Sequence, residues 1–126
     1  MTSKGKAVEL MVSDDVKRQL CALARSSRTR TAVFNPSRPT HWAPYEVRCP
    51  GSGDTFTADS AWHFVADMIE GGAEMETISL AKPAGKTGYV MIVEGFGGEK
   101  IYIKLQLGSG QVIGRSFHIS VNEDQL

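Results

Sequence analysis

Residues 98–120, GEKIYIKLQLGSGQVIGRSFHIS, constrain the fold more than any other stretch, because polar and apolar side chains alternate on both sides of a glycine-rich turn. Such alternation is typical of β-strands that pack one face on a core. The apolar positions are Ile101, Ile103, Leu105 and Leu107 before the turn and Ile113, Phe117 and Ile119 after it. The turn at residues 108–110 is expected to join two antiparallel strands.

Polar side chains are expected on the other face of this strand pair. If the two apolar faces share one core, the opposite surface, here named the polar face, contains Tyr102, Lys104, Gln106, Ser116 and His118. Nowhere else does local geometry alone bring together a His, a Lys and a Tyr. Strict alternation directs Arg115 towards the core. It therefore reaches the polar face only if Gly114 forms a β-bulge, or else it lies at the sheet edge.

Two helices are predicted before these strands. Ser13 is a suitable N-cap for a helix at residues 14–26, which has acidic residues in its first turn and apolar residues at helical spacing. A second helix begins after Thr57 and stops at the glycines at residues 71–72. Its apolar stripe consists of Ala61, Phe64, Val65, Met68 and Ile69.

Further strands at residues 75–81 and 88–93 complete a four-stranded antiparallel meander with residues 98–120. A short strand is also predicted at residues 45–49 and an edge strand at residues 6–12, whereas the prolines of residues 31–44 predict an irregular loop. Because an apolar sheet face needs a covering layer, we expect an α+β fold. Both helices should pack on one face of an antiparallel sheet of four or more strands.

Length and composition indicate one globular domain over residues 1–126, with a basic helical and loop half at 1–50 and a helix plus the meander at 51–126. Nine basic and four acidic residues give the first half a charge of +5, and five basic and ten acidic residues give the second −5. No apolar run approaches the ~18 residues of a membrane span. The polar N-terminus does not resemble a secretory signal, so we expect a cytoplasmic location and no membrane partner.

The basic half is a candidate surface for a polyanion such as RNA. The candidate RNA-binding residues are Arg25, Arg28 and Arg30, together with Trp42 as an aromatic platform on which a base stacks. Each has a structural alternative: the arginines form an ordinary solvated helix surface, and Trp42 packs over the sheet edge.

We expect no metal and no other cofactor. His63, Asp67 and Glu70 recur on one helix face, but the sequence offers no nearby donor to complete a metal site, so they are interpreted as a solvated surface. Cys21 and Cys49 lack metal-ligand spacing and are interpreted as buried free thiols.

The polar face has the groups that RNA cleavage without a metal requires. His118 can move protons near neutral pH, and the cations Lys104 and Arg115 can bind nonbridging phosphate oxygens. Tyr102 can stack on a base or relay a proton, and Ser116 lies beside these groups. An exposed sheet surface selected only for solubility is the alternative.

The segment IYIKL, followed after the glycine turn by VIGRSFH, resembles the last two strands of the RelE superfamily toxins, most closely the MqsR-type branch. The resemblance implies a RelE-like fold and an mRNA-cleaving toxin, with ribosome dependence open, silenced by a cognate antitoxin of helix-turn-helix type. It further implies that Tyr102 and Lys104 lie on the first catalytic strand and that His118 replaces the terminal basic residue. The longer N-terminal half, with its proline-rich loop, departs from the family pattern.

A second hypothesis is a non-catalytic protein-binding module that uses the exposed sheet face or the loop around Trp42. A toxin of the same superfamily that acts on gyrase rather than RNA belongs to this class. Incubation with labelled RNA separates the two hypotheses, because binding alone leaves the RNA intact.

Overall fold

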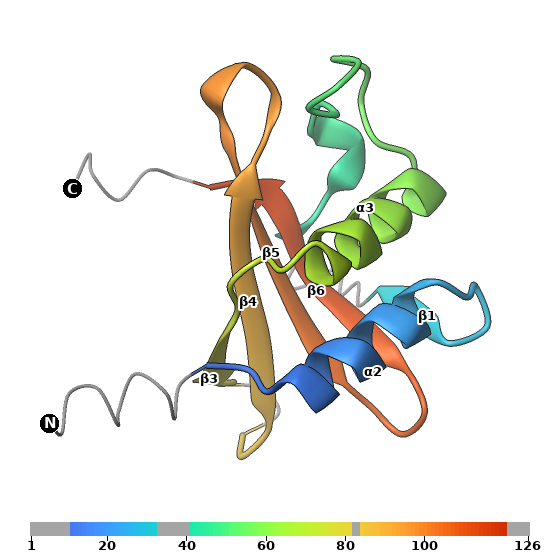
Figure 1. Cartoon of the computed structure of the whole chain (residues 1–126), viewed down its shortest axis with the longest axis vertical. Coiled ribbons are helices and arrows are strands. Elements are labelled where there is room, and N and C mark those ends of the chain that lie inside the picture. The colour runs from blue at the N-terminus through green and yellow to red at the C-terminus, as the bar shows by residue number, and fades with distance from the viewer. Residues whose placement is uncertain (1–10, 33–40, 82–83, 121–126) are drawn as a thin grey trace, which may run out of the picture.

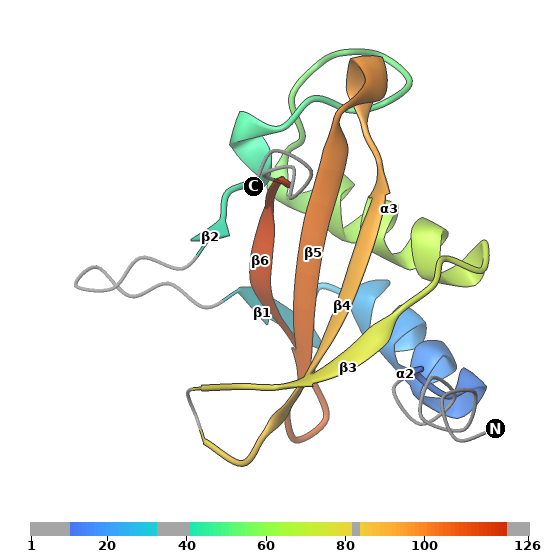
Figure 2. The same ribbon diagram turned by 90° about the vertical axis from the view of Figure 1, so that its left-hand side faces the viewer.

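The computed structural model describes residues 11–32, 41–81 and 84–120, and its central feature is a six-stranded sheet. The strand order is β1-β6-β5-β4-β3, and β2 also pairs with β6 (Figures 1 and 2). The strands are β1 (Arg30–Ala32), β2 (His41–Trp42), β3 (Glu76–Ser79), β4 (Thr87–Glu94), β5 (Lys100–Leu107) and β6 (Val112–Ile119).

Strands β3, β4, β5 and β6 pair antiparallel in chain order, which confirms the predicted four-stranded meander. The strands β1 and β2 instead pair in parallel with β6, so the sheet is mixed rather than purely antiparallel. The predicted loop at residues 31–44 is therefore wrong at both ends, because these short segments pair with the outer edge of β6. The middle of that loop, residues 33–40, lies outside the described residues.

Two helices, α2 (Asp14–Ala24) and α3 (Ala58–Glu70), confirm the helix predictions. The Ser13 side chain accepts a hydrogen bond from the Val16 amide, and Thr57 forms a reciprocal capping box with Ser60. Both helices cover the same face of the sheet (Figure 1). After a turn of 90°, the sheet face away from the helices is towards the viewer and the helices lie behind it (Figure 2). The expected α+β arrangement, with both helices on one sheet face, is confirmed.

The core lies between the helices and the sheet. Its fully buried side chains include Ile101, Ile103, Leu105 and Phe117 from the sheet and Leu20 and Val65 from the helices. The Phe117 ring contacts Phe56 and Trp42 edge to face, with centroids 5.1 and 5.4 Å apart. Such aromatic pairs contribute about 0.5–1.5 kcal/mol each beyond their buried area, so they stabilise the packing of β6 against β2 and the segment before α3.

The segment that precedes α3 differs from its prediction. Residues Pro44–Glu46 form a short 3-10 helix, η1, and only Arg48 makes a β-bridge, to Thr55. The predicted strand at 45–49 is wrong because Pro44, near the start of η1, has a fixed φ that suits a helical turn. At the other edge of the sheet, Met11 bridges Glu76, whereas residues 6–10 of the predicted edge strand lie outside the described residues.

No helix within the described ranges is both long enough and apolar enough to cross a membrane. Cys21 and Cys49 are free thiols, as expected, but both are half-buried rather than fully buried. The Cys21 thiol lies 3.5 Å from the Ala66 carbonyl oxygen, between the two helices.

Candidate functional site

A β-bulge in β6 decides which side chains share the polar face. Lys104 pairs with Ser116 and Leu105 pairs with Gly114, so Arg115 is the extra residue. The Arg115 side chain turns to the polar face, where its Nη1 donates to Oε1 of Gln106 at 2.9 Å. Of the two alternatives for Arg115, the bulge at Gly114 is confirmed, and Arg115 joins the polar face.

The bulge also reverses the alternation of β6 on its N-terminal side. Val112 is fully buried and pairs with Leu107, whereas Ile113 pairs with Gln106 and lies on the polar side. The prediction that Ile113 faces the core is therefore wrong, because one extra residue exchanges the two faces of a strand. Gly114 faces the core instead, where Trp42 packs against it.

Tyr102 and His118 form the first pair of reactive side chains on the polar face. They lie opposite each other on β5 and β6, and their rings stack with centroids 5.3 Å apart and planes inclined by 20°. Nδ1 of His118 lies 2.8 Å from the carbonyl oxygen of Ile119. Because a carbonyl only accepts, Nδ1 carries the proton, and Nε2 is the basic nitrogen of the neutral ring.

Lys104 lies next to this pair and opposite Ser116, of which only 4% is exposed. Lys104 is itself half-buried. Burial lowers the pKa of Lys104, and the positive charge of Arg115 lowers it further. A lysine in these surroundings releases its proton more readily than a solvated one, and this property suits a general acid.

Gln106 belongs to this site although the sequence did not identify it as a functional residue. Gln106 as a whole is 8% exposed, and its side chain accepts the hydrogen bond that fixes Arg115. The available signal was its position two residues after Lys104, on the same strand face.

The predicted RNA-binding arginines are not brought to the polar face. Arg25 follows α2, on the helix side of the sheet, and binds Asp67 at 2.9 Å and Glu70 at 2.5 Å. The hydrogen bonds that Arg25 donates to Asp67 and, with a smaller effect, to Glu70 raise the pKa of Arg25. Arg30, with a 7% exposed side chain, binds Asp59 at 2.7 Å and the Ala24 carbonyl at 2.9 Å. Arg28 is exposed.

Trp42 packs into the sheet edge, as its structural alternative predicted. Its ring lies 4.8 Å from that of Trp62 and 5.4 Å from that of Phe117. A Cβ atom at Gly114 would come within 2.5 Å of this ring. A base that stacks on the Trp42 ring would therefore compete with the residues that the ring now contacts.

The row of His63, Asp67 and Glu70 is exposed, as expected for a solvated surface, and its two carboxylates bind Arg25 across the helix pair. In the described parts of the chain, no three His, Cys, Asp or Glu side chains gather as metal ligands.

No protein-family model, curated protein or solved structure matches this chain. The function must therefore be argued from the residues of the polar face themselves.

Proposed function

We propose that the protein is a metal-independent endoribonuclease that cleaves mRNA, acting in the cytoplasm as the toxin of a toxin–antitoxin pair. The observation that carries this proposal is the β-bulge, because it adds the Arg115 guanidinium to the surface that already holds Lys104 and His118. Cleavage of a phosphodiester needs positive charge to stabilise the phosphate oxygens and a group that transfers protons. Arg115 and Lys104 supply the charge, and His118 supplies the proton transfer.

The strand register sets the spacing of the acid and the base. Tyr102 is directly opposite His118, and Lys104 is diagonal to His118. Diagonal neighbours on paired strands lie about 7–8 Å apart. That separation suits a phosphodiester between them, with a proton acceptor on one side and a proton donor on the other.

The reaction is a transfer within the RNA chain. Nε2 of His118 takes the proton of the ribose 2′-OH, and the resulting 2′-oxygen attacks the adjacent phosphorus. The bond from phosphorus to the 5′-oxygen breaks, and the Lys104 ammonium gives this leaving oxygen its proton. The products are a 2′,3′-cyclic phosphate and a 5′-hydroxyl end, with no net change in protons once His118 and Lys104 exchange theirs with water.

Arg115 stabilises the charge that develops on the nonbridging oxygens. A guanidinium has five N–H donors, so its hydrogen bond to Gln106 fixes the position of Arg115 without removing its charge. Tyr102 orients the His118 ring by stacking, and Ser116 lies on β6 opposite Lys104, two residues before His118.

The resemblance of residues 98–120 to the RelE superfamily, and to its MqsR-type branch, supports the same function. It also motivates the remaining parts of the proposal: an antitoxin of helix-turn-helix type as partner and mRNA, free or on the ribosome, as substrate. The paired arginines on the helix side are poor candidates for holding RNA, so we assign the initial capture of the phosphate backbone to Lys104 and Arg115.

The proposal is tested with purified protein and end-labelled RNA, in chelator, with and without ribosomes. His118→Ala and Lys104→Ala are expected to reduce the cleavage rate at least about 100-fold, because each removes a proton-transfer group. Lys100→Ala is the matched control, since Lys100 is an exposed lysine of the same strand that pairs with Glu94. Cleavage by His118→Ala at the parental rate would disprove the mechanism.

One observation favours the non-catalytic alternative. Ile92, opposite Tyr102 on β4, is 49% exposed, so the sheet surface beside the polar face has an apolar part of the kind that protein partners bind. A protein-binding module, including a toxin that acts on gyrase, would leave RNA intact under every condition of the same assay.

A further inference from the structure

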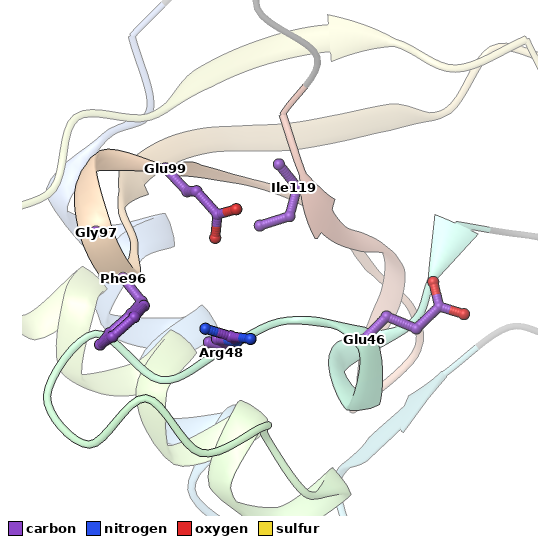
Figure 3. A pocket seen from close by; sticks show the side chains of 6 residues that line it. All are labelled: Glu46, Arg48, Phe96, Gly97, Glu99 and Ile119. Atoms are coloured by element: carbon purple, nitrogen blue, oxygen red, sulfur yellow. The ribbon is translucent and has the colours of Figure 1, made fainter.

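A second concave site lies where the β4–β5 turn faces the segment around η1. Its volume is about 390 Å³, and its lining residues are Glu46, Arg48, Phe96, Gly97, Glu99 and Ile119 (Figure 3). Three separate parts of the chain contribute to it: the η1 segment, the β4–β5 turn and the end of β6. None of these side chains has a part in the mechanism proposed for the polar face, to which Ile119 contributes only its backbone carbonyl.

Arg48 and Phe96 form a flat wall of this pocket. The Arg48 guanidinium carbon lies 5.7 Å from the centroid of the Phe96 ring. The same ring packs so closely on Gly53 that a Cβ atom there would come within 3.0 Å of it. A guanidinium held over an aromatic ring offers a planar cationic surface, on which nucleobases stack.

Glu99 supplies a hydrogen-bond acceptor beside this wall. The turn holds its backbone through bonds from the Gly95 amide to the Glu99 carbonyl, at 2.6 Å, and from the Glu99 amide to the Phe96 carbonyl, at 3.2 Å. Figure 3 shows the Glu99 carboxylate directed into the pocket between Ile119 and Arg48, whereas the Glu46 carboxylate points away from them.

We propose that this pocket binds a guanine base of the RNA substrate, with the base stacked on Arg48 and its edge hydrogen-bonded to Glu99. Guanine presents two adjacent N–H donors, at N1 and N2, which match the two oxygens of a carboxylate. Adenine and cytosine each place a ring-nitrogen acceptor next to their amino group, and uracil flanks its single N–H with carbonyl oxygens. A carboxylate therefore discriminates in favour of guanine.

The position of the pocket connects it to the polar face. Ile119 lines the pocket, and its carbonyl oxygen accepts the hydrogen bond from Nδ1 of His118. Ile119 packs against the core and pairs with the buried Ile101, so the pocket lies on the helix side of the sheet. A base in the pocket is thus at the same end of β6 as His118, and the RNA passes around this end of the strand to reach the polar face. The inference rests on the proposed ribonuclease function and adds to it a preference for guanine near the cleaved bond.

The test measures binding rather than cleavage. Fluorescein-labelled uridine hexanucleotides with 2′-O-methyl riboses resist cleavage, and each carries a single guanine or a single adenine at one position. We expect the parent protein to bind at least one guanine oligonucleotide about fivefold or more tightly than its adenine counterpart, as one bidentate base contact provides. In Glu99→Gln this ratio should fall to near one.

Glu74→Gln, a change of another exposed glutamate remote from the pocket, is the matched control and should keep the parental ratio. A parent that does not distinguish guanine from adenine, or a Glu99→Gln variant that still does, would overturn the pocket assignment. Because these oligonucleotides cannot be cleaved, guanine preference without ribonuclease activity would refute the proposed function alone. Ribonuclease activity without guanine preference would refute the pocket alone.

Discussion

The polar face depends on small groups of residues that position one another. Ring stacking with Tyr102 and the Ile119 carbonyl together fix the orientation of His118. Gln106 fixes Arg115, and Arg115 in turn lowers the pKa of Lys104 after the larger effect of burial. The protonation of Lys104 is therefore coupled to a residue that the bulge alone brings to this surface.

Lys104→Met should change how stability depends on pH. Because the pKa of Lys104 is lowered on folding from its ordinary 10.5, the unfolded chain binds this proton more tightly than the folded protein. The lysine thus disfavours folding below its folded pKa, and this penalty disappears as pH rises from that pKa towards 10.5. The variant should be the more stable protein at neutral pH and should lose this advantage in alkali.

Urea unfolding of the parent and the variant across neutral and alkaline pH measures this difference. Lys100→Met, which removes an exposed lysine of the same strand, serves as the control for the substitution itself. Parallel stability profiles for parent and Lys104→Met would contradict a lowered pKa.

Gly114→Ala tests the contact between β6 and the sheet edge. An added Cβ would lie 2.5–2.7 Å from three atoms of the Trp42 ring, so the ring must move out of the core. We expect a loss of about 1–3 kcal/mol in the free energy of unfolding, as for other overpacked sites. Gly51→Ala, where nothing lies within 4 Å, should change stability little in the same urea titration. Equal stability of the two variants would show that Trp42 does not restrict this position.

At the scale of elements, the bulge in β6 determines where Arg115 lies, whereas the residues on the core face keep their partners with or without it. Removal of Arg115 would leave Gly114 and Ser116 adjacent while each keeps its present partner, Leu105 and Lys104. The strand would then alternate regularly along its whole length, with the core face unchanged. We therefore expect the sheet to form without the bulge, whose effect in the structure is to place Arg115 on the polar face.

Deletion of Arg115 should accordingly give a folded protein with the β5–β6 register intact and with cleavage reduced at least tenfold, as in Arg115→Ala. Cross-strand amide proximities in an NMR spectrum report the register, and the RNA assay reports activity. Full cleavage by the deletion variant would show that Arg115 has no part in catalysis. A changed register would show that the bulge determines how β5 and β6 pair.

The sequence predicts those elements whose signals are local. The caps at Ser13 and Thr57 and the alternation of β5 are complete within a few residues, and the structure confirms them. Pairing of β1 and β2 with β6 joins segments distant in the chain, so no local pattern indicates it. The bulge could not be predicted from a local pattern either. Only the register of β5 and β6 distinguishes it from the alternative in which Arg115 lies at the sheet edge.

At the scale of the whole molecule, the two sheet faces have separate tasks. Both helices cover one face (Figures 1 and 2), and because the core side chains of β5 and β6 point to that face, the polar face is the other one. Two of the basic residues that follow α2 bind carboxylates of α3: Arg25 joins the end of α2 to Asp67 and Glu70, and Arg30 binds Asp59 near the start of α3. Mutations in the helix layer should therefore change stability without changing the proposed activity, and Arg115→Ala on the polar face should do the reverse.

Arg30→Met should lower the free energy of unfolding by about 1–3 kcal/mol, because Arg30 is buried and its loss leaves the Ala24 carbonyl and Asp59 without their donor. Arg28→Met, which removes an exposed arginine nearby, is the control and should have little effect. Affinity for uncleavable RNA should be similar in both variants. A selective loss of RNA binding in Arg30→Met, with stability unchanged, would restore the RNA-binding assignment of this residue.

The chemistry of the RNA ends tests the central claim most directly. RNA incubated with the purified protein in excess chelator, free and on ribosomes, is analysed for its new termini. Attack by the 2′-oxygen under the control of His118 and Lys104 predicts 2′,3′-cyclic phosphate and 5′-hydroxyl ends, absent with His118→Ala. Intact RNA under both conditions, or 5′-phosphate ends, would contradict the assignment of this protein as a metal-independent ribonuclease.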